Sequence, residues 1–420
     1  MASDEPKSKL LLLTAKFHSV GIAKLTRCRQ LACFVLIVLA LLSHGRATDP
    51  LWDPAIPVPP LEDLAIPVGM RFSVIKPYEF QNDGYRFLHG VALCFHRNRL
   101  YVSFGHNRGS ENTDTEEARW SVSDDQGRTW SPLKSIDEGT EPGVGVSHGA
   151  FLSHADKLWA FQGAYQDSMQ NVHTRAYVFN EADQRWIPQG TIIEQGFWPM
   201  QEPIRMPNGN WIMAGLKVGG GNPAIVAISQ GPDLLKWTAT SIPTDPMMKM
   251  WGESTVIVQG SRILNIARYG AAATALLALS NDYGLSWTNS TVSNLPMATS
   301  KPYAGTLSNG QNYLICTTTA NSGSKRAPLT IAVTRPGETL FSRVFKIRDA
   351  VFPEGPGESH PKAALAYPYA IEHAGYLYVG YSNSGGGIGR IGQGRELANN
   401  NSAELAVIPI SSLAISKVTR

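Results

Sequence analysis

The stretch Ser123–Trp130, which reads SDDQGRTW, is the most informative part of the chain because its pattern recurs. The pattern is Ser-x-Asp-x-Gly-x-Thr/Ser-Trp, and Ser280–Trp287 (SNDYGLSW) is a second complete copy. The Ser and Asp side chains of such a turn cap it through hydrogen bonds with the backbone, and the closing Trp packs between sheets. We therefore assign this turn motif a role in folding and none in catalysis.

Three weaker copies of the motif keep a turn and a closing aromatic residue: Asn180–Trp186, Ser229–Trp237 and Arg335–Phe341. The closing aromatic residues fall at positions 130, 186, 237, 287 and 341, a spacing of 50 to 56 residues. Between the motifs lie short apolar runs separated by polar turns, which favours antiparallel strands joined by hairpins. Four strands in each fifty-residue repeat are typical of a β-propeller blade.

Six such units begin near residues 88, 147, 201, 252, 301 and 367. The sequence therefore predicts an all-β fold, a six-bladed propeller of four-stranded antiparallel blades. The last unit ends after its third strand, at residues 404–409. The apolar stretch Met70–Ile75 before the first blade can supply the missing strand, and this would close the ring and remove an open sheet edge.

The chain divides into three predicted parts. Residues 1–47 have the pattern of a signal peptide: the apolar run Leu31–Leu42 follows basic residues and precedes the small-x-small sequence Gly45-Arg46-Ala47. The run is too short to span a bilayer, so we expect a secreted or periplasmic protein without stable membrane insertion after cleavage; an uncleaved membrane anchor is the alternative. Residues 48–67 are a Pro-rich extended lead-in outside the core, and 68–420 form the propeller.

Charge and cysteine content exclude several classes of protein. The chain has a net charge of +3, of which residues 1–47 carry +5, so the remainder carries −2 and has no basic surface for nucleic acid. Outside the leader only Cys94 and Cys316 remain, both in apolar runs, and we expect buried thiols rather than a disulfide. No metal-site or phosphate-loop pattern is present, so we expect no metal and no cofactor. We also expect a monomeric protein.

Candidate functional residues come from the start of each inner strand, because these positions face one another around a propeller channel. Buried charges are costly in a packed core, so polar residues at these places favour a solvated functional mouth, although a wide channel could simply be wet. The positions are His89, His148, Glu202, Glu253, the stretch 301–303 and Tyr367.

The repeated turn motif, known as the Asp box, together with six units and a leader, resembles the sialidase (neuraminidase) superfamily over roughly residues 70–415. The resemblance implies a Tyr nucleophile activated by Glu, an Asp acid/base, and three Arg that hold the substrate carboxylate. These residue types suit a sialoside, because a neutral phenol can approach an anomeric carbon that carries a carboxylate, whereas a carboxylate nucleophile would be repelled. Arginines bind that carboxylate with paired N–H donors.

Four residues in blades four to six match the family order Glu, Arg, Arg, Tyr. Glu253 resembles the activating Glu, and Arg268, fifteen residues later, resembles the second Arg. Arg326 resembles the third Arg, and Tyr367 resembles the nucleophile, with Tyr369 as the competing tyrosine.

Blade one departs from the family pattern. Where the family has Arg-Ile-Pro, this chain has Leu88-His89-Gly90, so the first Arg is replaced by His89 or by nearby Arg86. Where the family has Leu-Tyr-Glu, whose Glu orients that Arg, this chain has Gly380-Tyr381-Ser382. Because both members of one ion pair are missing together, we expect a remodelled carboxylate clamp.

The acid/base implied by the resemblance is Asp114, in the polar loop between the second and third strands of blade one, with Glu116 as its substitute. A solvated acidic loop explains the same residues. The residues expected to bind substrate are Arg268, Arg326, Arg86, His89, His148 and Glu202.

Three functions fit these residues. The first is an exported glycosidase of sialidase type that removes a terminal acidic sugar from a glycan or oligosaccharide. The second is a polysaccharide lyase, in which His89, His148 and a tyrosine remove a proton beside a uronate carboxylate. The third is a non-catalytic glycan-binding propeller, if the altered clamp has abolished activity.

Overall fold

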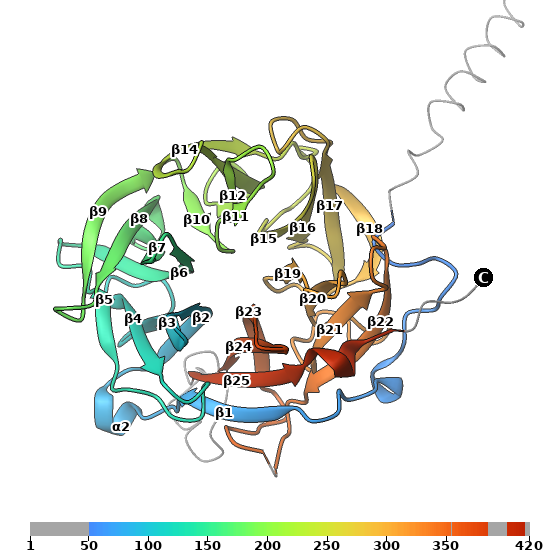
Figure 1. Cartoon of the computed structure of the whole chain (residues 1–420), viewed down its shortest axis with the longest axis horizontal. Helices are drawn as coiled ribbons and strands as arrows, with labels where there is room; N and C mark the ends of the chain where they lie inside the picture. The colour runs from blue at the N-terminus through green and yellow to red at the C-terminus, as the bar shows by residue number, and fades with distance from the viewer. Residues whose placement is uncertain (1–49, 354, 385–400, 416–420) are drawn as a thin grey trace, which may run out of the picture. The chain divides into compact units, whose positions relative to one another are not determined.

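Residues 50–353, 355–384 and 401–415 of the computed structural model are described here, and they form six antiparallel sheets around a common axis (Figure 1). Five sheets have four strands, and in the remaining sheet the inner strand is split in two. The predicted all-β, six-bladed propeller is therefore confirmed. The predicted signal peptide lies outside the described residues.

Within each blade the strands follow the chain from the axis outward (Figure 1). Blade 1 comprises β2 (Phe87–His96), β3 (Arg99–Asn107), β4 (Glu116–Ser123) and β5 (Lys134–Asp137). Blade 2 comprises β6 (Val144–His154), β7 (Lys157–Gln166), β8 (Gln170–Asn180) and β9 (Arg185–Ile193). Blade 3 comprises β10 (Phe197–Pro199), β11 (Ile204–Arg205), β12 (Trp211–Lys217), β13 (Ala224–Gln230) and β14 (Asp233–Ser241).

The second half of the ring repeats this order. Blade 4 comprises β15 (Ser254–Gln259), β16 (Arg262–Arg268), β17 (Thr274–Ser280) and β18 (Thr291–Pro296). Blade 5 comprises β19 (Tyr303–Thr306), β20 (Asn312–Cys316), β21 (Leu329–Thr334) and β22 (Phe341–Arg348). Blade 6 comprises β23 (Ala364–His373), β24 (Tyr376–Ser384), β25 (Asn401–Pro409) and, from the start of the chain, β1 (Arg71–Lys76). Short helical turns are η1 (Leu61–Asp63), α2 (Phe80–Asp83) and η3 (Ile410–Leu413).

Strand β1 closes the ring. It pairs antiparallel with β25, with Arg71 opposite Val407 and Val74 opposite Glu404. This confirms the predicted closing strand, one residue further along than the expected Met70–Ile75. Strand β1 thereby covers the edge of β25, which would otherwise be the exposed edge of blade 6.

The Asp boxes are rigid turns, as their sequence predicted. In the first copy, the Ser123 hydroxyl accepts the N–H of Gly127 at 2.7 Å, and the Asp125 carboxylate accepts the N–H of Thr129 at 2.8 Å. Gly127 has φ +82°, and a Cβ there would lie 2.3 Å from the Leu405 side chain of blade 6, so glycine is required twice over. Trp130 packs against the hydrophobic cluster shared by blades 1, 5 and 6.

The lead-in was expected to lie outside the core, but several of its side chains, including Leu64, are buried. Leu51 and Trp52 are 1% and 2% exposed and belong to the cluster between blades 4 and 5. Trp52 forms a bridge to Phe341 on β22, and Ala65 forms another to Phe345. The segment runs extended along the outer strand of blade 5 and covers apolar surface that would otherwise face water.

Cys94 and Cys316 are buried free thiols, as predicted. Within the described ranges, no helix is long and apolar enough to cross a bilayer.

Candidate active site

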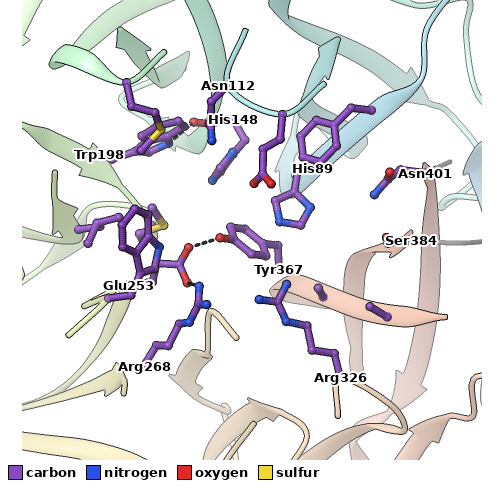
Figure 2. Close-up of a pocket in the computed structure, with 18 residues that line it drawn as sticks. His89, Asn112, His148, Trp198, Glu253, Arg268, Arg326, Tyr367, Ser384 and Asn401 are labelled. Atoms are coloured by element: carbon purple, nitrogen blue, oxygen red, sulfur yellow. Dashed lines mark hydrogen bonds and ion pairs between the residues drawn. The ribbon is translucent and has the colours of Figure 1, made fainter. Parts of the chain in front are cut away.

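A pocket of about 270 Å³ lies among the inner strands, and six of the residues predicted for the site line it. Those six are His89, His148, Glu253, Arg268, Arg326 and Tyr367. Trp198, Met200 and Trp251 form an apolar part of the wall. Figure 2 shows Tyr367 near the middle of this group, between the two histidines and the two arginines.

Tyr367 and Glu253 form the centre of the site. The phenol hydroxyl donates a short hydrogen bond to one carboxylate oxygen of Glu253, and Arg268 Nη1 donates to the other at 2.8 Å (Figure 2). The two side chains that share the short bond are 7% and 1% exposed. Burial, together with the carboxylates of Glu253 and Glu111, raises the pKa of Tyr367 well above its ordinary value, so the phenol is neutral and its proton points at Glu253.

The backbone of β23 turns Tyr367 into the pocket. The residue has φ +53°, and the pairing of β23 with β24 shifts register between Ala366 and Tyr369, which marks a β-bulge. A non-glycine residue in the left-handed region costs on the order of 1–3 kcal/mol and occurs mainly where function needs a particular side-chain direction. Lys301 Nζ donates to the Pro368 carbonyl at 3.0 Å and so holds the bulge from the neighbouring blade.

The same irregularity recurs in blades 1 and 2. The register of β2 shifts between His89 and Ala92, and that of β6 shifts between Val146 and Gly149. In blade 1 the bulge contains Gly90 at φ +68°, where a Cβ would lie 2.1 Å from the His148 ring. Three inner strands thus use a bulge to aim a polar side chain at the pocket.

The two arginines reach the pocket from blades 4 and 5. Arg268 ends β16, and its backbone N–H donates to the Glu253 carbonyl at 2.9 Å, which sets the two residues side by side. Arg326 precedes β21, and its Nη2 donates to the Thr299 carbonyl at 3.0 Å. Tyr369, the competing tyrosine, does not line the pocket; its ring lies 4.6 Å from that of Tyr303.

The structure brings together His89 and Ser382, which the resemblance predicted as replacements for the family's first Arg, with Arg86 as the alternative, and for the Glu that orients it. His89 Nδ1 lies 3.1 Å from the Ser382 hydroxyl. The imidazole also lies against Tyr367, with 3.5 Å between ring centroids. Burial, and then the positive charges nearby, lower the pKa of His89 well below its ordinary value, so the ring is neutral.

His148 is held in a similar way in blade 2. Its Nδ1 lies 3.1 Å from the Ser147 hydroxyl, which donates a short hydrogen bond to Glu116. Burial and the charge of Lys301 lower the pKa of His148 to about 3, so this ring is also neutral. Glu116, the substitute acid/base of the sequence prediction, is therefore a buried support for His148 and does not line the pocket.

Three other predicted residues lie away from the pocket. Asp114 is exposed on its loop, Arg86 places its guanidinium 4.9 Å from the Phe80 ring, and Glu202 accepts a hydrogen bond of 2.5 Å from the Tyr303 hydroxyl. None of the three lines the pocket, so their expected positions at the site are corrected.

Glu111 is a titratable pocket residue that sequence reasoning missed. It belongs to the same loop as Asp114 and lines the pocket at its open side. The surrounding walls remove part of its bulk water, and the carboxylates of Glu116 and Glu253 repel its charge, which together raise its pKa to about 7. An acidic run without periodicity gives no signal for which carboxylate faces the channel, and only the turn geometry of the loop decides it.

A metal site has no basis in the part of the chain that the structure describes, where no group of three or more His, Cys, Asp or Glu could hold an ion. The chemistry available at the pocket is that of a neutral phenol beside a carboxylate, two guanidinium groups, two neutral imidazoles and a carboxyl with a pKa near neutrality.

Comparison with known proteins gives a family and a fold. The profile of the family described as "BNR repeat-like domain" matches residues 119–379. No curated protein matches the chain.

Among solved structures, a protein of unknown function from Dyadobacter fermentans has a TM-score of 0.59 at 14% identity, covering 81% of this chain and 99% of its own. A mutant NanB sialidase from Streptococcus pneumoniae has a TM-score of 0.55 at 11% identity, covering 78% of this chain and 69% of its own. The Trypanosoma rangeli sialidase has a TM-score of 0.56 at 12% identity, covering 84% of this chain and 60% of its own. Likeness at such low identity shows the shared propeller fold.

Proposed function

The chain belongs to the BNR repeat-like family, in the superfamily of sialidase-like propellers, and we propose that it is an exported glycoside hydrolase that removes a terminal acidic sugar from glycans. The observation that carries the proposal is the hydrogen bond from the Tyr367 phenol to Glu253, whose carboxylate is fixed by Arg268. Export is supported by the leader pattern within residues 1–47.

In the first step the Tyr367 oxygen attacks the anomeric carbon while the bond from that carbon to the leaving oxygen breaks. Glu253 takes the phenol proton, and Glu111 gives a proton to the leaving oxygen, so no free oxyanion is released. In the second step water attacks the same carbon with Glu111 as base, the bond from that carbon to the Tyr367 oxygen breaks, and Tyr367 recovers its proton from Glu253. Two displacements at one carbon retain the anomeric configuration.

The electrostatics of the pocket favour a neutral nucleophile and an anionic substrate. Tyr367 stays protonated until attack because its pKa is raised, so it does not repel a substrate carboxylate. Arg326 makes no ion pair within 4.0 Å among the described residues, and its remaining N–H groups can bind a carboxylate. Arg268 is already committed in part to Glu253.

The test is hydrolysis of 4-methylumbelliferyl N-acetylneuraminide by the protein and by two tyrosine variants. We expect Tyr367→Phe to lower kcat by at least about 1000-fold, because the nucleophile is lost while the ring is kept. Tyr369→Phe is the matched control, since it removes a hydroxyl from the same strand outside the pocket, and it should change kcat less than about threefold. Full activity in Tyr367→Phe would remove the tyrosine from the mechanism.

A second function, a lyase acting on uronate polysaccharides, is favoured by one observation: the neutral His89 ring lies directly against Tyr367. His89 would take the proton from the carbon beside the carboxylate, the bond to the neighbouring glycosidic oxygen would break, and Tyr367 would protonate that oxygen. The product carries a carbon–carbon double bond and absorbs ultraviolet light. An increase in ultraviolet absorbance with uronate polymers, without release of the fluorophore from the sialoside, would identify this function. No product in either assay, with retained glycan binding, would identify a binding propeller.

A further inference from the structure

His89 carries its ring proton on Nδ1, as its hydrogen-bond partners require. Ser382 Oγ lies 3.0 Å from the Ala366 carbonyl oxygen, which can only accept, so the serine spends its single hydroxyl proton there. The same serine oxygen must then accept from His89 Nδ1, 3.1 Å away. A neutral imidazole with a proton on Nδ1 has an unprotonated Nε2, which is a hydrogen-bond acceptor.

His148 follows the same rule with a different serine. Ser147 donates its hydroxyl proton to Glu116, and its oxygen therefore accepts from His148 Nδ1 at 3.1 Å. Trp198 Nε1 donates to the His148 carbonyl at 3.0 Å and fixes the backbone beneath the ring. The Nε2 atom of His148 is again the acceptor.

The Nε2 atom of His148 is buried, on a residue only 6% exposed, and it has no hydrogen-bond partner within the described part of the chain. A buried polar atom without a partner costs about 1–3 kcal/mol, so its presence in a pocket calls for a partner from outside. Figure 2 shows both imidazoles on one side of Tyr367 and both guanidinium groups on the other. The imidazole acceptors and the guanidinium donors therefore lie on opposite sides of Tyr367.

We propose that the Nε2 atoms of His89 and His148 form a hydrogen-bond acceptor subsite that binds hydroxyl or amide N–H groups of the substrate sugar, while Arg268 and Arg326 bind its carboxylate. The inference rests on the proposed function for the ligand being an acidic sugar. The predicted substrate class is an acidic sugar. Its carboxylate is bound only on the arginine side of Tyr367, and its hydroxyl or amide N–H groups are bound on the histidine side.

The two histidines themselves disfavour a carboxylate. Two unprotonated nitrogens repel a carboxylate oxygen, because neither side offers a proton. An arginine at position 89 would have the opposite preference, since guanidinium has five donors and no acceptor. The exchange of an Arg–Glu pair for His89 and Ser382 therefore changes the kind of group bound and does not merely weaken one clamp.

The first test reads the tautomers directly and requires no turnover. The protein is labelled with ring-15N histidine, and the two pocket histidines are assigned by the signals missing from His89→Gln and His148→Gln. We expect both rings to be neutral at pH 7 with the proton on Nδ1. An imidazolium, or a proton on Nε2, at either ring would overturn the proposal, whereas failure to hydrolyse any glycoside would count only against the proposed function.

The second test compares two small acids by isothermal titration calorimetry: D-glucuronic acid, which carries ring hydroxyls, and cyclohexanecarboxylic acid, which carries none. The wild type should bind the hydroxylated acid at least about tenfold more tightly, the effect expected of one or two satisfied hydrogen bonds. His148→Phe should lose most of this preference, and His148→Gln, which keeps an acceptor near the Nε2 position, should retain it. An unchanged preference in His148→Phe would overturn the subsite.

Discussion

Glu111 has a pKa near neutrality for two reasons that act together. The pocket walls reduce its hydration, which disfavours the charged form, and the carboxylates of Glu116 and Glu253 add like-charge repulsion. A carboxyl group with a pKa of about 7 is half protonated at neutral pH, which suits a group that must first give a proton and later take one. Glu111 and Asp114 are both exposed on this loop, but only Glu111 lines the pocket.

Glu111→Gln should therefore lower kcat/KM on a sialyl oligosaccharide by about 100-fold or more, within the range that general acids contribute. On the 4-methylumbelliferyl glycoside the loss should be less than about tenfold, because that leaving group needs little protonation. The protonated form is present below its pKa, so wild-type activity on the oligosaccharide should fall as pH rises through about 7.

The control for this assignment is the shape of the pH profile. The fall near pH 7 should vanish in Glu111→Gln, whereas a fall nearer pH 8 could come from the buried Lys301, whose pKa is lowered to about 8 by burial. Asp114→Asn should leave the profile as it is in the wild type. A profile that changes in Asp114→Asn and not in Glu111→Gln would return the acid/base role to the residue predicted from sequence.

At the level of the strand, the bulge that carries Tyr367 depends on its neighbour in blade 5. The left-handed backbone of Tyr367 is strained, and Lys301 stabilises it by donating to the next carbonyl, that of Pro368. Lys301 is also buried near the carboxylates of Glu253 and Glu202. These negative charges favour the charged form of Lys301 and partly oppose the effect of burial on its pKa. It is a positioning residue and does not touch the reacting atoms in this scheme.

Lys301→Met keeps the length of the side chain and removes the donor. We expect kcat to fall by about 10- to 100-fold with little change in KM, because a small displacement of a nucleophile costs rate more than ground-state binding. Lys362→Met, at an exposed position, is the matched control and should leave both constants unchanged. A lower folding stability in Lys301→Met, together with kcat and KM that worsen to a similar extent, would show that Lys301 has a purely structural role.

The strand pattern also explains which parts of the site could be predicted from sequence. Glu253 comes directly before β15, and Arg268 ends β16. Arg326 precedes β21, and Tyr367 lies within β23. The repeat predicted the blade of each residue, and the resemblance to the family order selected these four. The bulges could not be predicted in the same way, because only Gly90 marks one by a residue type that favours positive φ. The sequence predicted Tyr367 with Tyr369 as its competitor, and the register shift between Ala366 and Tyr369 lies where Tyr367 turns into the pocket.

For the whole molecule, the count of blades and the closure by β1 followed from the spacing of the closing aromatic residues and from the missing strand of the last unit. The burial of Leu51 and Trp52 did not follow, because a Pro-rich segment without periodicity gives no hint of the surface it covers. Closure and lead-in together tie the first part of the propeller to its last two blades. The ring therefore has no free blade from which unfolding could begin at low cost.

The last prediction concerns this closure. Ile75, 7% exposed on β1, packs in the cluster shared by blades 1, 5 and 6, and Ile75→Ala should lower the free energy of unfolding by about 2–4 kcal/mol. Every blade is held by two neighbours, so we expect a single unfolding transition in urea. Measured by tryptophan fluorescence, the whole transition should shift to a lower urea concentration in Ile75→Ala. Val68→Ala, at a side chain 83% exposed, is the control and should change stability by less than about 0.5 kcal/mol. A split curve, in which only an early phase moves, would show that blade 6 can open separately and that the closing strand does not unite the ring.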